Sequence, residues 1–225
     1  MQRSQYMFWS EEQKTNHNTS SDVIDVIFKI KATNIPCDHI FYLQQEILRI
    51  IPEYKKQSQN SIQNIHISEQ ACGWVRDDNK PLQISKRTHL NLRLHKKSID
   101  LIDNLTQKTL NINSYPLQIL SYKTRPLKPA KTLLSRFVYS EIENEENFLI
   151  SVAQELKKLN IDVKKMLCGK TRFIKTSPKI LKTRSLLIAD LKAVDSIKIQ
   201  QEGIGDYKLA GCGIFIPYKN LDAVR

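Results

Sequence analysis

One order of strand-like and helix-like segments occurs twice along these 225 residues, and it restricts the fold more than any other feature. In the first half, apolar residues recur at every second position of 23–31 (Ile24, Val26, Phe28 and Ile30), as in a strand. Ile40, Leu43 and Ile47 then recur at helical spacing after Asp38, a suitable N-cap. The expected elements of this half are strands at 23–31, 62–67, 88–95 and 109–122, and helices at 38–51 and 98–105.

The second half repeats the order β-α-β-β-α-β, which is that of a ferredoxin-like unit. Its expected elements are strands at 133–140, 171–176, 180–189 and 214–217, and helices at 146–159 and 193–201. The sequence therefore predicts an α+β protein with two tandem ferredoxin-like (RRM-like) βαββαβ domains. We expect an N-terminal extension at 1–22, a first domain at 23–123, a linker rich in Pro and Lys at 124–131, and a second domain at 132–225. A single mixed α+β domain is the alternative.

The positive charge of the chain is large and unevenly distributed. The formal net charge is +12, and more than half of the 35 Lys and Arg residues fall in three stretches without Asp or Glu, at 79–99, 104–140 and 163–189. Such stretches indicate an anionic partner, and we expect nucleic acid. A membrane surface fits less well, because the basic stretches are mostly strands and linkers rather than amphipathic helices.

The cysteines and the N-terminal residues point away from metal, disulfide and membrane classes. The four cysteines are scattered without a Cys-x-x-Cys pair, and residues 1–22 hold no apolar core of a signal peptide. We therefore expect reduced thiols in a cytoplasmic protein with no cofactor and no metal. The one alternative metal set, Cys37, His39, His66 and Cys72, has a spacing that fits no common site.

Glycine is concentrated near the C-terminus. Four of the six glycines, at positions 203, 205, 211 and 213, lie within eleven residues. This is neither a Walker loop nor a Rossmann fingerprint, because no Gly-Lys-Ser/Thr follows and the stretch precedes a strand. Glycines here would let backbone N–H groups approach phosphates closely.

Residues 200–217 resemble the glycine-rich loop of the CRISPR-associated Cas-six superfamily, the endoribonucleases that process repeat RNA. The most similar branch is the one named for myxobacterial type I systems. The resemblance extends over about residues 23–219, although Asp206-Tyr207-Lys208 stands where the family often has arginines. Its other supporting segments are 34–43, 85–93, 125–129 and 196–200.

The resemblance implies metal-independent cleavage of CRISPR repeat RNA, in which a ribose 2′-OH attacks the adjacent phosphate. The products would be a 2′,3′-cyclic phosphate and a 5′-OH. His39, in the first turn of the first helix, is the expected acid–base group, because a helix N-terminus favours a neutral imidazole and a bound phosphate. Tyr42 lies on the same flank and is expected to orient the phosphate or assist proton transfer. His66 is the second choice for the acid–base role.

We further expect an RNA-binding surface that holds the repeat hairpin, with other subunits of a type I effector complex as partners. Sequence leaves open whether the glycine-rich loop contacts RNA or packs the two domains together. The expected RNA-binding residues are Lys86, Arg87, Arg93, Arg172, Lys175, Lys179, Lys182, Gly203, Gly205, Lys208, Gly211 and Gly213.

Two other functions stay open on the sequence. One is a non-catalytic RNA-binding subunit of a CRISPR effector complex, including one tied to transposition. The other is an unrelated basic RNA-binding module, although the chain lacks the RNP1 motif of a typical RRM.

Overall fold

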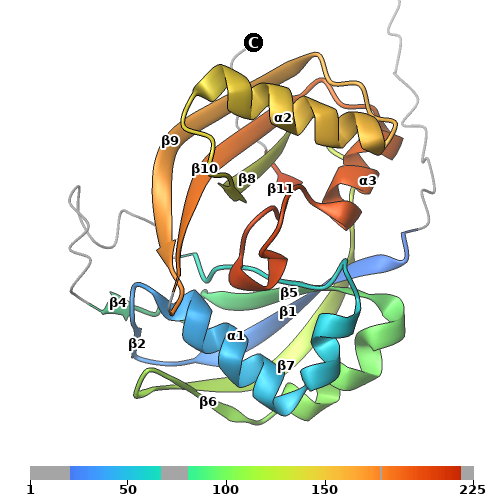
Figure 1. The fold of residues 1–225 in the computed structure, drawn as a ribbon. Helices are drawn as coiled ribbons and strands as arrows, with labels where there is room; N and C mark the ends of the chain where they lie inside the picture. Colours follow the sequence, from blue (N-terminus) through green and yellow to red (C-terminus); the bar gives the residue numbers. More distant parts are fainter. Residues whose placement is uncertain (1–20, 67–80, 178, 219–225) are drawn as a thin grey trace, which may run out of the picture.

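The computed structural model describes residues 21–66, 81–177 and 179–218, which form two antiparallel sheets flanked by helices (Figure 1). Residues 1–20 of the expected extension, and Cys72, lie outside the described residues. No helix in the described ranges is long and apolar enough to cross a membrane.

The first sheet has the strand order β3-β5-β1-β7-β6. One face of β1 buries Val26, Phe28 and Ile30 in the same cluster as Ile40 and Leu43 of α1, which explains the apolar residue at every second position of β1 and the helical spacing in α1. The elements are β1 (Val23–Lys31), α1 (His39–Ile50), η1 (Pro52–Lys56), β3 (Ser61–Ile62), β5 (His89–His95), the 3-10 helix η3 (Lys96–Leu105), β6 (Thr109–Ile112) and β7 (Tyr115–Pro126). A separate two-stranded sheet pairs β2 (Asn34–Ile35) with β4 (Leu82–Gln83).

The second sheet has the strand order β11-β8-β10-β9. Leu186 and Ile188 of β10 pack in one buried cluster with Phe148 and Val152 of α2 and Ile199 of α3. Both sheets have the strand order of a ferredoxin-like unit, with the first and third strands in the centre. The elements are β8 (Leu133–Tyr139), α2 (Glu145–Lys158), β9 (Lys165–Lys175), β10 (Ile180–Ala189), α3 (Ala193–Glu202), the short 3-10 helix η4 (Lys208–Ala210) and β11 (Ile216–Pro217).

Several element boundaries differ from the sequence-based expectation. Residues 109–122 form a hairpin rather than one extended segment, because Asn113 and Ser114 both adopt positive φ (51° and 71°) and turn the chain. β7 runs to Pro126, three residues into the expected linker, because Arg125 and Pro126 pair with β1. β9 begins at Lys165 instead of 171. Of the strand expected at 62–67, residues 62–66 contribute only Ile62, in β3 (Ser61–Ile62), and residue 67 lies outside the described residues.

The two halves pack on each other through the face of the first sheet that α1 does not cover. Arg93 of β5 donates hydrogen bonds across this boundary to the carbonyl oxygens of Gln200 and Phe215, both at 2.8 Å. Ile174 and Leu181, from the far end of the β9–β10 hairpin, belong to the buried cluster of the first half. The hairpin therefore reaches past its own sheet to the N-terminal end of α1 (Figure 1).

Candidate functional site

His39 lies at the N-terminal end of α1, where its imidazole is buried and hydrogen-bonded on both nitrogens. Its side chain is only 3% exposed. Nδ1 lies 3.1 Å from the carbonyl oxygens of Pro36 and Cys37, and Nε2 accepts the backbone N–H of Ile65 at 3.1 Å. Because Nε2 accepts while Nδ1 faces two carbonyls, this arrangement requires the neutral Nδ1–H tautomer. The imidazole joins the start of α1 to the segment that follows β3.

Three segments distant in sequence surround this end of α1. A Cβ added to Gly211 would lie 3.4 Å from the side chain of Ile40, so the glycine-rich segment (residues 203–213) touches the first turn of α1. The ammonium of Lys175, at the end of β9, lies 3.4 Å from the carboxylate of Asp38. That carboxylate makes no capping hydrogen bond, so Asp38 precedes α1 without capping it through its side chain, contrary to expectation. We call this meeting point of α1, the glycine-rich segment and the β9–β10 hairpin the junction.

Tyr42 is half-buried on α1, and its ring stands edge-on to Phe41 with 5.3 Å between centroids. It packs against the first buried cluster. Its place three residues after His39 on one helix agrees with the expected shared flank.

The glycine-rich segment packs the halves of the molecule against each other. All four of its glycines have positive φ. Gly213 is buried where the chain folds back on itself: its N–H donates to Phe137 at 2.6 Å and its carbonyl accepts from Ile204 at 3.1 Å. A Cβ on Gly213 would lie 2.1 Å from the carbonyl oxygen of Ile204. The glycines thus serve close backbone approach within the second half. Ala210 and Cys212 of the same segment are buried in the cluster of the first half, so the segment also packs the two halves together, which was one of the two roles that the sequence left open.

Lys208, expected to bind RNA, points inward. Its ammonium donates to the carbonyl oxygen of Glu202 at 2.7 Å, and burial lowers the pKa of Lys208 from its ordinary value. This contact satisfies a carbonyl at the C-terminal end of α3, where a cation is favourable. The structure therefore gives Lys208 a helix-capping role.

The expectation that Arg93 binds phosphate is wrong for this structure. Its side chain is 1% exposed, and its guanidinium donates to Asp25 at 2.8 Å as well as to the two carbonyl oxygens named above. Asp25 also receives a bond from Arg125 at 3.2 Å. At 1% exposure this guanidinium presents no donor to a phosphate in solvent. The alternation in β5 located Arg93 on the polar face, but that face is covered by the second half.

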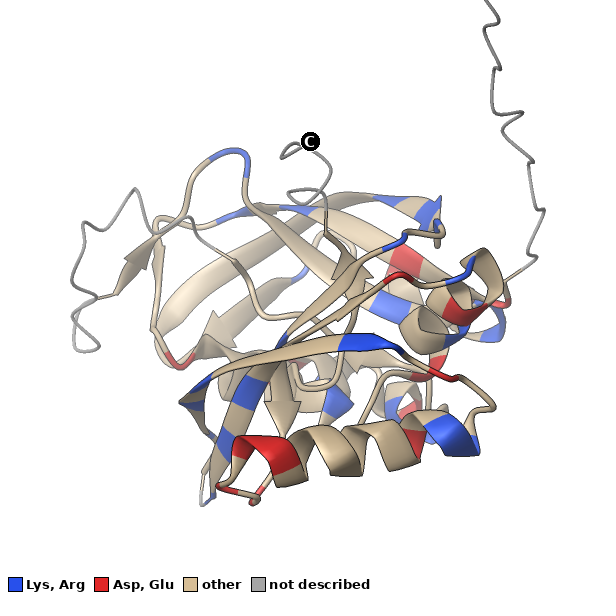
Figure 2. Ribbon diagram, turned by 90° about the horizontal axis from the view of Figure 1, so that it is seen from above, with Lys and Arg blue, Asp and Glu red and all other residues tan. Residues whose placement is uncertain are grey.

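The stretches that lack acids in sequence acquire acidic partners in space. Lys182 pairs with Glu143 at 2.7 Å and Arg184 with Glu145 at 3.1 Å, so carboxylates at the start of α2 lie against β10. Figure 2 shows the acidic first turn and basic last turn of α2. These ion pairs reduce the charge that the hairpin offers to an anion.

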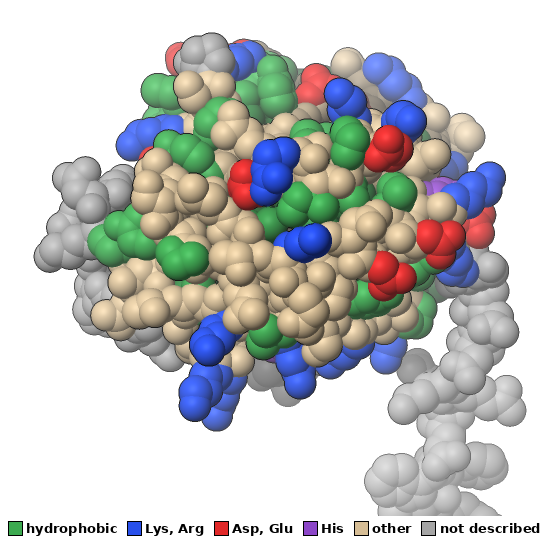
Figure 3. Space-filling model, turned by 90° about the horizontal axis from the view of Figure 1, so that it is seen from below, with side chains coloured by type: hydrophobic (Ala, Val, Ile, Leu, Met, Phe, Trp, Pro, Cys, Tyr) green, Lys and Arg blue, Asp and Glu red, His purple; other side chains and the backbone are tan. Residues whose placement is uncertain are grey.

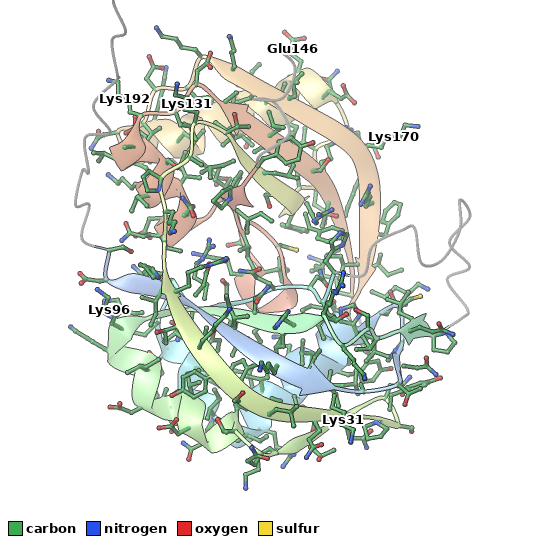
Figure 4. The ribbon with its side chains drawn as sticks, turned by 180° about the vertical axis from the view of Figure 1, so that it is seen from behind. Lys31, Lys96, Lys131, Glu146, Lys170 and Lys192 are labelled. Atoms are coloured by element: carbon green, nitrogen blue, oxygen red, sulfur yellow. The ribbon has the colours of Figure 1, made fainter. Side chains whose placement is uncertain are left out.

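The remaining positive charge is spread around the molecule. Lys131 and Lys192 lie at one end of the second half, and Lys170 on the opposite side of the same view (Figure 4). On the face seen from below, acidic, basic and apolar side chains are mixed (Figure 3). Lys86 and Arg87 are exposed in the turn before β5, and Arg172 is exposed on β9.

Two tyrosines that the sequence analysis did not single out complete the junction. The Lys179 ammonium donates to the hydroxyl oxygens of Tyr139 and Tyr207, both at 3.1 Å. These bonds raise the pKa of Lys179, and the bond that the Tyr139 hydroxyl donates to Glu141 raises the pKa of Tyr139. The one sequence signal was an aromatic residue inside a glycine-rich stretch; nothing local linked it to residues 139 and 179.

No group of three or more His, Cys, Asp or Glu side chains within the described ranges is arranged to hold a metal ion. His66 is exposed and adjacent to Ile65, the residue that donates to His39, and Cys37 is half-buried. Cys72 of the alternative metal set lies outside these ranges.

Most of the chain matches one family of known proteins. A sequence model of the family described as Cas6 Crispr matches residues 24–220. The chain belongs to the Cas6 family. The resemblance predicted from the glycine-rich stretch is therefore confirmed.

A curated Cas6 relative is the CRISPR-associated endonuclease Cas6 of Myxococcus xanthus (strain DK1622), 22% identical over 195 residues, which are 86% of this chain and 81% of the relative. Solved structures share the Cas6 fold. One described as CRISPR associated protein Cas6 has a TM-score of 0.61 at 13% identity, covering 88% of this chain and 100% of that one. A Cas6-related protein from Pyrococcus furiosus has a TM-score of 0.59 at 11% identity, covering 88% and 99%. An RAMP protein binding different RNA substrates has a TM-score of 0.60 at 11% identity, covering 87% and 100%.

Proposed function

We propose that this Cas6-family chain is a metal-independent endoribonuclease that cleaves CRISPR repeat RNA into guide RNA. The 2′-OH before the cleaved bond attacks the phosphate, giving a 2′,3′-cyclic phosphate and a 5′-OH. The match of the family to residues 24–220, which include both sheets and the whole junction, carries this proposal. Two similar proteins support it. The relative named an endonuclease supports the cleavage, and the solved protein named for binding RNA substrates supports RNA as the substrate.

His39 is the proposed acid–base group because its neutral Nδ1–H tautomer makes Nε2 a proton acceptor. The Nε2 lone pair accepts the Ile65 N–H, so the 2′-OH of the RNA must replace this donor before proton transfer. Tyr42, on the same helix, orients the phosphate. Lys175, next to Asp38, supplies positive charge for the phosphorane oxygens.

The same geometry favours one second function, a non-catalytic subunit that holds guide RNA in an effector complex. The observation behind it is the burial of His39, whose two ring nitrogens bond to backbone groups. In that case the imidazole fixes the start of α1 and does not contact RNA. Retention of the hairpin and contacts with other effector subunits belong to both proposals.

Cleavage of a repeat RNA in EDTA separates the two functions. The wild type should cut the RNA, and His39→Asn should slow cleavage at least 100-fold, as for loss of an acid–base group. An Asn side chain retains an N–H donor toward the Pro36 and Cys37 carbonyls, which limits structural damage. Binding is measured with RNA carrying a 2′-deoxyribose at the cleavage position, and it should be unchanged.

His95→Asn is the matched control, because His95 ends β5 opposite Val23 at the start of β1, whereas α1 follows the other end of β1. His66→Asn tests the second-choice histidine. Full cleavage by His39→Asn would remove His39 from the mechanism. Tight hairpin binding without cleavage by the wild type would establish the non-catalytic function.

A further inference from the structure

Lys179 differs from the other cations of the β9–β10 hairpin that face the junction or α2. Lys175, Lys182 and Arg184 each pair with a carboxylate. Lys179 instead bonds to two neutral phenol oxygens, and it makes no ion pair within the part of the chain that the structure describes. Its ammonium is thus held in place without a direct carboxylate partner, and the Glu141 carboxylate contacts it only through the shared Tyr139 hydroxyl. This combination suits a phosphate group.

Tyr207 occupies a backbone conformation that ordinarily selects glycine. Five residues of the glycine-rich segment have positive φ, and Tyr207 (φ 62°) is the one that is not glycine. Its carbonyl accepts the N–H groups of Ala210 and Cys212, at 2.9 and 3.2 Å, which hold the turn. A bulky residue in this region is strained, and such strain concentrates at functional sites.

The ring of Tyr207 is presented to solvent from this rigid turn. The side chain is 40% exposed, and its ring stands edge-on to that of Tyr139, with 4.7 Å between centroids. The Lys179 ammonium lies 5.3 Å from the Tyr207 ring centroid. An exposed aromatic face beside a fixed cation matches the two parts of a nucleotide, because bases stack on aromatic rings and phosphates bind cations.

We propose that Tyr207, supported by Tyr139 and Lys179, is a binding site for one unpaired nucleotide of the RNA. The base stacks on Tyr207 and the phosphate contacts the Lys179 ammonium. A base within a duplex is already stacked on its neighbours, so the ligand comes from a single-stranded segment flanking the hairpin stem. Lys175, four residues before Lys179, contacts Asp38 beside His39, which places this nucleotide next to the proposed cleavage site. The inference rests on the proposed function only in taking RNA as the ligand.

Two substitutions test the site. Tyr207→Gly removes the ring and also relieves the backbone strain, so its melting temperature should equal or exceed that of the wild type. Its affinity for a repeat stem-loop with unpaired flanks should fall about tenfold, as for loss of one stacked base. Lys179→Gln should weaken the same binding. The matched controls are Tyr115→Leu, in the β6–β7 hairpin, and Lys157→Gln, in the last turn of α2, and neither should change affinity.

Photocrosslinking locates the base. 5-Iodouridine is placed at one unpaired position at a time, and mass spectrometry should map a crosslink to Tyr207 in the wild type and none there in Tyr207→Gly. Wild-type affinity in Tyr207→Gly, or a loss of affinity accompanied by a lower melting temperature, would overturn the site. A wild type that binds the stem-loop without cutting it would count against catalysis alone and leave the test valid. A wild type without affinity for the stem-loop would overturn both proposals.

Discussion

Arg93 joins the two halves of the molecule through one buried side chain. It is held by the Asp25 carboxylate and by the carbonyl oxygens of Gln200 and Phe215, three partners from three segments. A buried ion pair is strongly destabilising when only one partner is removed, because the other keeps an uncompensated charge. The remaining partner of Asp25 is Arg125, whose side chain is half exposed to water.

Arg93→Ala should lower the free energy of unfolding by about 3–5 kcal/mol. The loss comes from the stranded Asp25 charge and from two buried carbonyls without donors. Urea denaturation measures it, with Arg172→Ala as the control, since Arg172 is exposed on β9. Equal midpoints for the two variants would contradict the structural role of Arg93.

Cys212 gives the stability a dependence on alkaline pH. Burial raises the pKa of its thiol from 9.0 to about 12. Between these values the unfolded chain loses the proton while the folded chain keeps it, so stability falls as pH rises from 9 to 12. The thiol contributes a slope of at most about 1.4 kcal/mol per pH unit.

Cys212→Ala should therefore lose stability less steeply than the wild type above pH 9, as measured by urea midpoints at several pH values. Burial also raises the pKa of the Tyr54 phenol, so some decline remains in the variant. Parallel curves for the two proteins would contradict the assignment to Cys212.

At the scale of an element, the glycine-rich segment is defined by its backbone more than by its side chains. Gly203 and Gly213 face each other, and a Cβ on Gly203 would lie 2.5 Å from the Gly213 carbonyl oxygen. Gly205 is different, because the nearest atom to a Cβ there is 3.7 Å away. Both Gly205 and Gly213 have positive φ, but only Gly213 lacks room for a Cβ. Comparing an alanine substitution at each position therefore isolates the cost of steric overlap from the cost of backbone strain.

Gly213→Ala should destabilise the fold more than Gly205→Ala. Alanine at positive φ costs about 1–2 kcal/mol at either position. At Gly213 the overlap with Ile204 adds about 1–3 kcal/mol, because backbone atoms must move. Thermal unfolding of the two variants provides the comparison, and equal losses would show that position 213 has more room than the structure indicates.

At the scale of the whole molecule, the hairpin of the second half completes the core of the first. Ile174 and Leu181 from β9 and β10 are buried with α1, as are Ala210 and Cys212 from the glycine-rich segment. Stability of the α1 region therefore depends on residues more than 100 positions away in sequence.

Leu181→Ala should lower the free energy of unfolding by about 2–5 kcal/mol and loosen both halves. Hydrogen exchange followed by mass spectrometry should show faster exchange in α1 as well as in β10. Leu187→Ala, at a half-buried position of the same strand, serves as the control. Faster exchange confined to β9 and β10 would indicate that the two halves are independent.

The sequence by itself determined the order of elements and the family. Local sterics and burial of one face produce the alternation in β1 and β5 and the helical spacing in α1. These elements could therefore be predicted without knowledge of any distant contact. The sequence did not predict the β6–β7 turn, because Asn113 and Ser114, rather than glycine, adopt the positive φ values there.

Only the tertiary structure decided which polar groups face water. The burial of His39, the inward turn of Arg93 and Lys208, and the ion pairs of Lys182 and Arg184 all depend on which surfaces meet. The cluster of Tyr139, Lys179 and Tyr207 likewise joins residues 28 and 40 positions apart. Periodicity records whether a side chain points to one face of an element. Packing between distant segments decides what covers that face, and a local sequence pattern holds no information about such packing.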